Sequence, residues 1–184
     1  GKDAYLFRKV DYQQGLSNSA VLCLYQDKAG LMWFGTYDGV NCYDGKGIEV
    51  FRSDFSMKKT LSNNVIHSIQ QADSSCLWIT THLGVNRFSQ DSRQVVGYYD
   101  FTGDYYLHSN PKGDTWVVSD EGIFYYNTYH KKFVHLKNIE TPVENMDQRA
   151  FVTDDGVLWT FPRNTGSLIQ CSLDGFDRDT LSVR

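Results

Sequence analysis

The chain has 184 residues, of which 18 are Lys or Arg and 22 are Asp or Glu, so its net charge at neutral pH is −4. This acidic balance argues against a protein that binds nucleic acid through bulk electrostatics, and no apolar run approaches the ~20 residues needed to span a bilayer. The composition also excludes an all-α fold, because Ala occurs only 5 times while aromatic residues, which suit strands, make up 15% of the chain.

The N-terminal segment predicts a strand at Tyr5–Val10. Its Phe7-Arg8 pair recurs as Phe51-Arg52, and the two pairs lie nine and ten residues before a Leu-Ser-Asn tripeptide. Since Phe51-Arg52 falls at the end of the next expected unit, we interpret residues 1–14 as the outer strand of a unit whose other strands lie elsewhere.

Residues 15–55 form the first full unit, in which four short strands are expected. Turns rich in Asp and Gly separate the strands, and these residues supply the backbone geometry of tight turns. The expected strands are Ala20–Tyr25, Leu31–Thr36, Gly39–Tyr43 and Gly47–Ser53.

Residues 56–101 repeat this pattern and align with the first unit without a gap. Leu16-Ser17-Asn18 corresponds to Leu61-Ser62-Asn63. Two looser units come next, at 102–140 and 141–184. The strands expected in the second unit are Val65–Gln70, Cys76–Thr81, Gly84–Phe88 and Val95–Tyr99.

One tryptophan and one glycine mark the same position in all four units. The tryptophans are 45, 38 and 43 residues apart, and a glycine comes six residues after each of the first three and seven after the fourth. These residues are Trp33, Trp78, Trp116 and Trp159, with Gly39, Gly84, Gly122 and Gly166. A period of about 40–45 residues with four strands per unit is typical of β-propeller blades. A β-sandwich, the alternative all-β fold, does not explain the fixed offset from Trp to Gly.

The repeat therefore predicts an all-β protein, a β-propeller sector of about four four-stranded antiparallel blades. A Trp on the second strand would fill the wedge between neighbouring blades, and Gly would open the third strand where a positive φ is required. We accordingly expect these residues to be structural and the tryptophans to be buried. Because most propellers have more blades, we expect part of a larger ring rather than a complete four-bladed one.

The motifs of the first unit resemble the two-component regulator propeller repeat. The similarity lies in Gly15–Asn18, in the run Gln26–Thr36 and in the run Gly39–Gly45. It is close in the first unit, good in the second and partial beyond. Ser75-Cys76 and the stretch Pro162–Thr165 depart from the pattern.

The resemblance implies a function. Such repeats build the sensor regions of hybrid two-component system proteins, so the chain is expected to be a non-catalytic, periplasmic sensing segment of an inner-membrane sensor histidine kinase that drives a phosphorelay. The resemblance also implies seven blades in the complete propeller and a glycan or oligosaccharide as the signal. The segment itself is expected to contact neither membrane nor nucleic acid.

A candidate ligand-binding face is formed by two kinds of loop that a propeller places on one side. Four residues after each tryptophan, the loop between strands two and three carries Tyr37, His82, Asp120 or Arg163. The loops that lead into strand one carry Asn18 and Asn63. Varied polar and aromatic groups on a rigid scaffold suit sugar recognition, while ordinary solvated loop tips are the alternative interpretation.

No catalytic, metal-binding or cofactor-binding motif stands out. The adjacent Asp120-Glu121 could imitate a catalytic carboxylate pair, but adjacent residues usually point apart and acidic turns are common. The five histidines share no ligand spacing, so neither a metal nor a cofactor is expected. Cys23 and Cys42 are expected on strands two apart in one sheet, about 10 Å from each other and beyond disulfide reach. An even number of cysteines in an oxidising compartment is the argument for disulfides, but we favour free, buried thiols at Cys23, Cys42, Cys76 and Cys171.

Two other functions remain open from the sequence: a propeller enzyme acting on polysaccharide as a lyase or glycosidase, and a pure protein-interaction scaffold. A sensor binds an oligosaccharide without consuming it, an enzyme consumes it, and a scaffold does neither.

The chain is also expected to self-associate. A propeller sector exposes the apolar sides of its first and last blades, so we expect a homodimer formed through those sides or through the Tyr5–Val10 strand.

Overall fold

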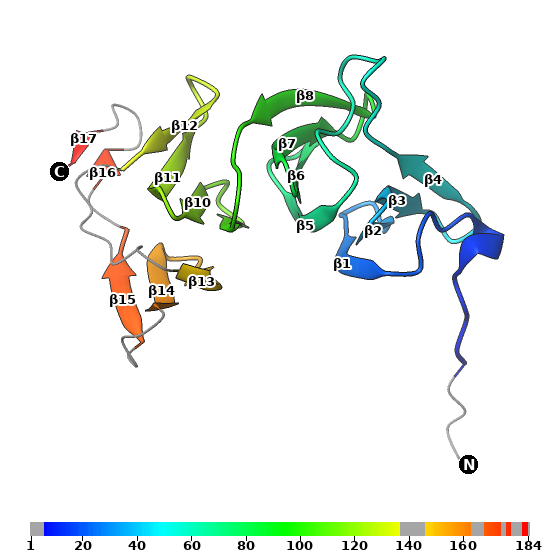
Figure 1. The fold of residues 1–184 in the computed structure, drawn as a ribbon, viewed down its shortest axis with the longest axis horizontal. Helices are drawn as coiled ribbons and strands as arrows, with labels where there is room; N and C mark the ends of the chain where they lie inside the picture. Colours follow the sequence, from blue (N-terminus) through cyan, green and yellow to red (C-terminus); the bar gives the residue numbers. More distant parts are fainter. Residues whose placement is uncertain (1–5, 137–145, 163–167, 174–175, 178–181, 184) are drawn as a thin grey trace, which may run out of the picture.

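The computed structural model describes residues 6–136, 146–162, 168–173, 176–177 and 182–183. Their regular structure is almost entirely strand, with one short 3-10 helix, η1 (Tyr12–Gln14). The sheets succeed one another in chain order along an open arc, from which the N-terminal segment projects (Figure 1). The prediction of an all-β propeller sector is confirmed. Within the described ranges no helix has the length and apolar character needed to cross a membrane.

The first three units each form a four-stranded antiparallel sheet, and we call them blades 1, 2 and 3. Blade 1 consists of β1 (Val21–Gln26), β2 (Met32–Thr36), β3 (Gly39–Tyr43) and β4 (Ile48–Phe51). Blade 2 consists of β5 (Ile66–Gln71), β6 (Cys76–Thr81), β7 (Gly84–Ser89) and β8 (Gln94–Tyr99). Blade 3 consists of β9 (Tyr105–Ser109), β10 (Thr115–Ser119), β11 (Gly122–Asn127) and β12 (Lys132–His135). The strands expected in blades 1 and 2 agree with these bounds to within one or two residues.

The fourth unit, blade 4, differs from the others in its described residues. Its antiparallel sheet has three strands, β13 (Met146–Val152), β14 (Val157–Pro162) and β15 (Ile169–Ser172). The next strand, β16 (Phe176–Asp177), pairs with β17 (Ser182–Val183) rather than with β15. The described residues of this last segment therefore form a small antiparallel pair of their own.

Hydrophobic clusters fill the boundaries between neighbouring blades. Side chains alternate along a strand, so adjacent residues face different blades. On β6, Leu77 and Ile79 belong to the cluster shared with blade 1, while Trp78 belongs to the cluster shared with blade 3. On β10, Val117 joins the cluster with blade 2 and Trp116 the cluster with blade 4.

Three of the four repeat tryptophans are buried at these boundaries, as predicted. The exposed fractions of Trp33, Trp78 and Trp116 are 1%, 1% and 2%. Trp159 occupies the corresponding place on the second strand of blade 4, but its side chain is only partly buried. Trp159 is therefore less completely buried than the other three, because no further blade among the described residues covers it.

The repeat glycines adopt the predicted left-handed conformation where each third strand begins. The angle φ is +94° at Gly39, +97° at Gly84 and +125° at Gly122. A Cβ at Gly84 would also lie 2.6 Å from the backbone oxygen of Tyr99, closer than any carbon can approach without movement. Gly166 lies outside the described residues.

A polar triad repeats in blades 1 and 2 and anchors the loop that precedes each first strand. In blade 1, Asn41 Nδ2 donates to Ser17 Oγ at 2.8 Å, and Ser17 Oγ lies 3.2 Å from Thr36 Oγ1. The same contacts recur in blade 2, at 2.8 and 2.9 Å, between Asn86, Ser62 and Thr81. The repeated Leu-Ser-Asn tripeptide is thus explained by the need to fasten this loop to the second and third strands.

The strand predicted at Tyr5–Val10 is not formed by its described residues. Residues 6–10 have no strand structure, and Leu6 and Phe7 are 94% and 93% exposed. A strand needs a hydrogen-bonding neighbour, and the predicted neighbour belongs to another blade whose other strands are not among the described residues. That residues 1–14 complete such a blade therefore stays a prediction.

Candidate functional site

The predicted ligand face is occupied by exposed loop residues. Tyr37, His82 and Asp120 lie in the turns between the second and third strands of blades 1, 2 and 3, and each is exposed. The structure thus places these three at equivalent positions of successive blades. Arg163 lies outside the described residues. The role of these residues in ligand binding stays a prediction.

Asn18 and Asn63 have a local structural use in the loops before the first strands. The Oδ1 atom of Asn18 accepts a hydrogen bond from the backbone NH of Ala20 at 2.8 Å, and Asn63 Oδ1 accepts one from Val65 at 2.9 Å. Each side chain shapes the turn that leads into its blade. Their amide oxygens are therefore engaged by the protein itself.

His82 is joined by residues from two innermost strands. The ring of His67 on β5 lies 6.1 Å from the ring of His82 and 6.4 Å from that of Tyr105 on β9. Tyr105 Oη donates to the backbone oxygen of Thr81 at 2.6 Å, and burial raises the pKa of this phenol. Burial, together with the charge of His82, lowers the pKa of His67. A neutral His67 offers one donor and one acceptor beside the predicted face.

Titratable groups elsewhere form no reactive centre in the part of the chain that is described. Asp120 and Glu121 are adjacent, exposed residues of one turn. No group of three or more His, Cys, Asp or Glu side chains among the described residues is arranged to hold a metal ion. Cys23, Cys42 and Cys76 are free thiols, and burial raises the pKa of Cys23 to about 11.

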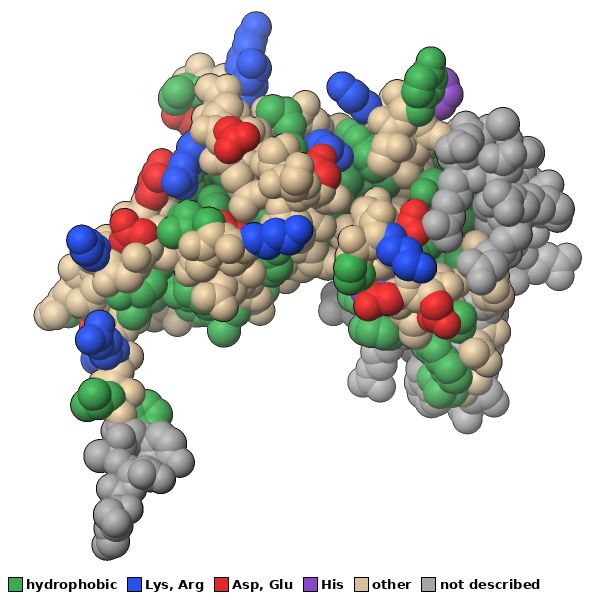
Figure 2. Space-filling view, turned by 180° about the vertical axis from the view of Figure 1, so that it is seen from behind, with side chains coloured by type: hydrophobic (Ala, Val, Ile, Leu, Met, Phe, Trp, Pro, Cys, Tyr) green, Lys and Arg blue, Asp and Glu red, His purple; other side chains and the backbone are tan. Residues whose placement is uncertain are grey.

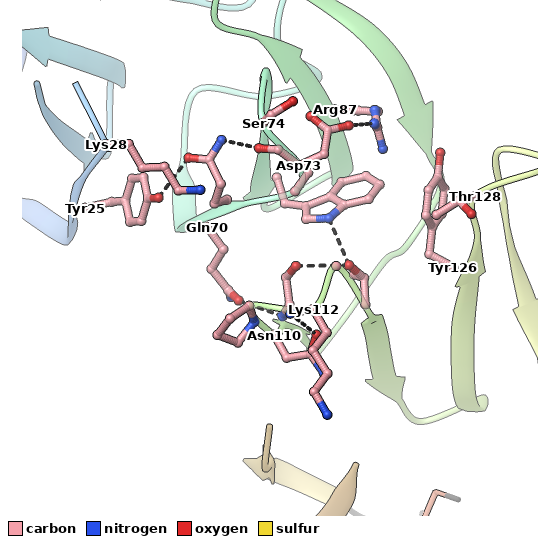
Figure 3. Close-up of a pocket in the computed structure, with 17 residues that line it drawn as sticks. Tyr25, Lys28, Gln70, Asp73, Ser74, Arg87, Asn110, Lys112, Tyr126 and Thr128 are labelled. Atoms are coloured by element: carbon pink, nitrogen blue, oxygen red, sulfur yellow. Dashed lines mark hydrogen bonds and ion pairs between the residues drawn. The ribbon is translucent and has the colours of Figure 1, made fainter. Parts of the chain in front are cut away.

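A cavity of about 650 Å³ lies at the other end of the strands, where blades 1, 2 and 3 meet. Its walls come largely from the turns that join the first and second strands of each blade, including Lys28, Asp73, Ser74 and Lys112. We call it the interblade pocket (Figure 3). Its volume falls in the range of about 300–1,000 Å³ common for small-molecule sites.

An ion pair between Asp73 and Arg87 borders the interblade pocket, as Figure 3 shows. The guanidinium carbon of Arg87 lies 5.3 Å from the centre of the Trp78 ring and 5.7 Å from that of Tyr126. Burial opposes ionisation of Asp73, but hydrogen bonds from the Ser75 backbone and the charge of Arg87 lower its pKa below the usual value. Both charges of the pair are therefore present at neutral pH.

The inner part of the interblade pocket is held by hydrogen bonds between blades. Tyr25 Oη donates to Gln71 Oε1 at 2.8 Å, which links blades 1 and 2. Gln70 Nε2 donates to the backbone oxygen of Leu107 at 2.7 Å, which links blades 2 and 3. Trp78 Nε1 donates to Thr115 Oγ1 of blade 3 at 3.1 Å. These contacts fix the walls without using the lysine and hydroxyl groups at the rim.

Sequence reasoning missed the interblade pocket because its lining comes from turns on the side opposite the predicted face. One signal was present. The second unit departs from the first at Ser75-Cys76, and the two units also differ close by, at Ala72 and Arg87. Differences between two otherwise matching repeats would have pointed to this boundary.

Comparison with known proteins agrees with the fold. Residues 15–38 match the family described as two component regulator propeller. The extracellular domain of a hybrid two-component system from B. thetaiotaomicron is 26% identical to this chain, with a TM-score of 0.76, and the match covers 98% of this chain and 26% of that one. Histidine kinase P4 from Formosa agariphila is 38% identical over 50 residues, which cover 27% of this chain and 4% of the kinase.

A more distant likeness concerns the fold alone. A catalytically inactive virginiamycin B lyase from Staphylococcus aureus is 16% identical, with a TM-score of 0.53 over 86% of this chain and 58% of the lyase. The chain thus spans about a quarter of the length of the solved extracellular domain and a small fraction of the curated kinase that it matches.

Proposed function

Because the chain carries the two-component regulator propeller repeat, we propose that it is a periplasmic signal-sensing segment of a hybrid two-component sensor histidine kinase and that its signal is an oligosaccharide. In this function the segment binds the signal without chemical turnover. The kinase reaction and the phosphorelay belong to other parts of the whole protein.

The observation that carries the proposal is the likeness to an extracellular domain of a hybrid two-component system over 98% of this chain. The loop face supports it further, because Tyr37 offers an aromatic ring, Asp120 offers acceptors, and His82 with His67 offers imidazole nitrogens. Aromatic planes with convergent donors and acceptors are what sugars require. On the face that Figure 2 shows, positive and negative side chains are mixed and form no continuous basic patch.

A binding and turnover experiment tests the proposal. The purified chain is titrated by calorimetry with plant, algal and host oligosaccharides, and each mixture is then analysed by chromatography for cleavage products. Binding with unchanged oligosaccharide is the expected result. Tyr37→Ala should weaken that binding while leaving the melting temperature nearly unchanged, because Tyr37 is an exposed loop residue.

Two outcomes would assign a different function. Cleavage that is lost in Asp120→Asn or Glu121→Gln would make the chain an enzyme. Absence of both binding and cleavage across the oligosaccharides would contradict oligosaccharide sensing and favour a protein-interaction scaffold. Leu83→Ala, a change at an exposed apolar neighbour of His82, serves as the control for the loop-face variants.

A further inference from the structure

We propose that the interblade pocket is a second binding site, separate from the loop face, and that it takes a small hydroxylated anion of the sugar-acid class. The pocket lies at the end of the strands opposite the loops that carry Tyr37 and His82. Its occupancy therefore does not depend on whether the loop face binds an oligosaccharide.

The first support is that the pocket forms where blade 2 departs from the repeat. In blade 1, the buried Asp27 accepts a hydrogen bond from Trp33 Nε1 at 2.9 Å and one from Gln90 Nε2 at 3.3 Å. That carboxylate occupies the space beside the tryptophan. The corresponding residue of blade 2 is Ala72, whose methyl group cannot reach Trp78 in the same way.

A second departure lies on the same wall. Cys42 of blade 1 corresponds to Arg87 of blade 2, since each pairs with the repeat tryptophan of the neighbouring strand. A small apolar side chain is thus replaced by a guanidinium at the pocket, and a carboxylate by a methyl group. The methyl group of Ala72 leaves more space at the boundary between blades 2 and 3 than the carboxylate of Asp27 leaves at the boundary between blades 1 and 2, and both changes make the former boundary more positive.

The charge of the lining points to an anionic ligand. Three cations line the pocket, Lys28, Arg87 and Lys112, against one carboxylate, Asp73, in a chain whose net charge is −4. Asp73 is already paired with Arg87. Among the described residues no ion pair engages the ammonium group of Lys28 or Lys112. Two cations are thus available to a carboxylate or sulfate group.

The remaining polar groups suit hydroxyls. The Ser74 and Thr128 side chains line the pocket and make no hydrogen bond within the described structure. Figure 3 shows Lys28 reaching from the β1–β2 turn toward Gln70, with Ser74 above and Lys112 at the lower edge. Hydroxyl groups both donate and accept, so a polyhydroxylated ring could engage these residues while its acidic group lies near a lysine.

The test compares two sugars that differ only at C6, where one has a carboxylate and the other a hydroxymethyl group, and adds inorganic phosphate as a simple anion. The full chain, labelled with 15N, is titrated with D-galacturonate, with D-galactose and with inorganic phosphate while its amide resonances are followed. Galacturonate should shift the amides of residues 72–75 and of Asn110, Lys112 and Gly113. Galactose should bind at least about tenfold more weakly because it lacks the charged contact. Equal binding of phosphate would overturn the sugar-acid assignment, leaving a general anion site.

Variants of the lining residues test whether galacturonate binds in the interblade pocket. The double variant Lys28→Gln with Lys112→Gln should lower the affinity for galacturonate about tenfold or more, whereas Lys58→Gln, an exposed lysine outside the pocket, should not. Ala72→Asp introduces the residue that blade 1 has at this position and should abolish binding. Galacturonate binding that survives both pocket variants, or no galacturonate binding by the unmodified chain, overturns the proposal.

The oligosaccharide site at the loop face and the sugar-acid site in the interblade pocket can be tested independently. Tyr37→Ala should leave galacturonate binding intact, since Tyr37 is far from the pocket lining along β2. If galacturonate binds at the interblade pocket and no oligosaccharide binds at the loop face, the proposal of oligosaccharide sensing at the loop face is contradicted. The proposal of a second site in the interblade pocket is then still supported. Oligosaccharide binding abolished by Tyr37→Ala, without any galacturonate binding, would overturn the second site alone.

Discussion

Trp78 and Trp159 occupy the same repeat position, yet one is enclosed by the next blade and the other is partly exposed. At the scale of residues, the burial of a repeated side chain depends on whether a neighbouring blade covers it. Trp78 contacts Tyr99, Tyr126 and Phe133, with ring centres 5.8, 4.8 and 5.6 Å away. This aromatic cluster belongs to two blades and cannot form without either.

Trp78→Ala should therefore destabilise the chain strongly. Removing a fully buried Trp costs about 3–5 kcal/mol in free energy of unfolding, since the cavity left behind cannot close completely. Trp159→Ala is the matched comparison and should cost clearly less, because its side chain already meets solvent. Urea unfolding followed by fluorescence measures both. Equal losses would contradict the assignment of Trp78 to an interblade core.

Two glycines with almost the same φ allow strain to be separated from crowding. Gly84 and Gly45 have φ of +97° and +95°, but only Gly84 has neighbours within reach of an added Cβ. Gly45→Ala should cost about 1 kcal/mol from backbone strain alone. Gly84→Ala should cost more, because the Tyr99 backbone must also move. Thermal unfolding of the two variants checks the order, and the reverse order would exclude the close approach.

The stability of the chain should fall as the pH drops below about 6.5, the ordinary pKa of histidine. Burial lowers the pKa of His108 despite the opposing carboxylate of Asp154, whose Oδ1 lies 3.4 Å from Nε2. The folded chain then resists a proton that the unfolded chain accepts. Its stability is complete above the unfolded pKa and decreases below it. The same sign applies to His67, whose pKa is also lowered.

Melting temperatures measured from about pH 7.5 to about pH 5.5 test this dependence. The decrease should be smaller in His108→Gln, which cannot take up the proton. The lowered pKa of Asp73 acts only below its usual value of 3.8 and so lies outside this window. A melting temperature that rises toward pH 5.5 would contradict the lowered histidine pKa values.

At the scale of elements, the strands were predictable because Trp, Gly and turn residues recur at a fixed offset. Gly39–Tyr43 and Cys76–Thr81 were predicted with the bounds that the structure shows. The described residues of Tyr5–Val10 form no strand, because a strand needs a hydrogen-bonding neighbour and the blade predicted to supply it is not among the described residues. The repeat likewise marked equivalent loops but could not show that Asn18 Oδ1 is engaged by the backbone.

The interblade pocket was beyond prediction for a different reason. It depends on side chains from separate turns, such as Lys28, Ser74 and Lys112, that come together only when neighbouring blades pack. Periodicity identifies the features that the blades share, whereas a pocket between blades depends on where they differ. The substitution of Asp27 by Ala72 at the equivalent place is visible in the sequence, but its effect on space is not.

At the scale of the whole molecule, the face of blade 1 that is turned away from blade 2 is apolar and is not covered by another blade among the described residues. A groove of about 550 Å³ there is lined by Val10, Leu16, Val21, Leu22, Cys23, Leu24 and Phe34. Leu22 and Leu24 are 41% and 65% exposed. Because the described N-terminal residues form no strand, we propose that self-association, if driven by this chain alone, uses the blade side rather than strand pairing.

Light scattering coupled to size exclusion should accordingly show a dimer or larger species at micromolar concentrations. Leu24→Lys should shift the chain toward monomer, because a charge would have to be buried at the contact. Val96→Lys, at a similarly exposed residue of β8 outside the groove, is the control. Removing residues 1–9, which leaves every groove residue in place, should change little. A strictly monomeric chain at all concentrations would contradict the proposal.

The separate clusters at the blade boundaries have a dynamic consequence. Since each cluster joins only two adjacent blades, a disturbance at one boundary must pass through an intervening sheet to reach the next. Amide hydrogens of β6, β7, β10 and β11, which have a cluster on either side, should exchange with deuterium most slowly, and those of β1 and β15 much faster. A ligand in the interblade pocket would slow exchange first in blades 2 and 3, with an effect that fades blade by blade along the arc.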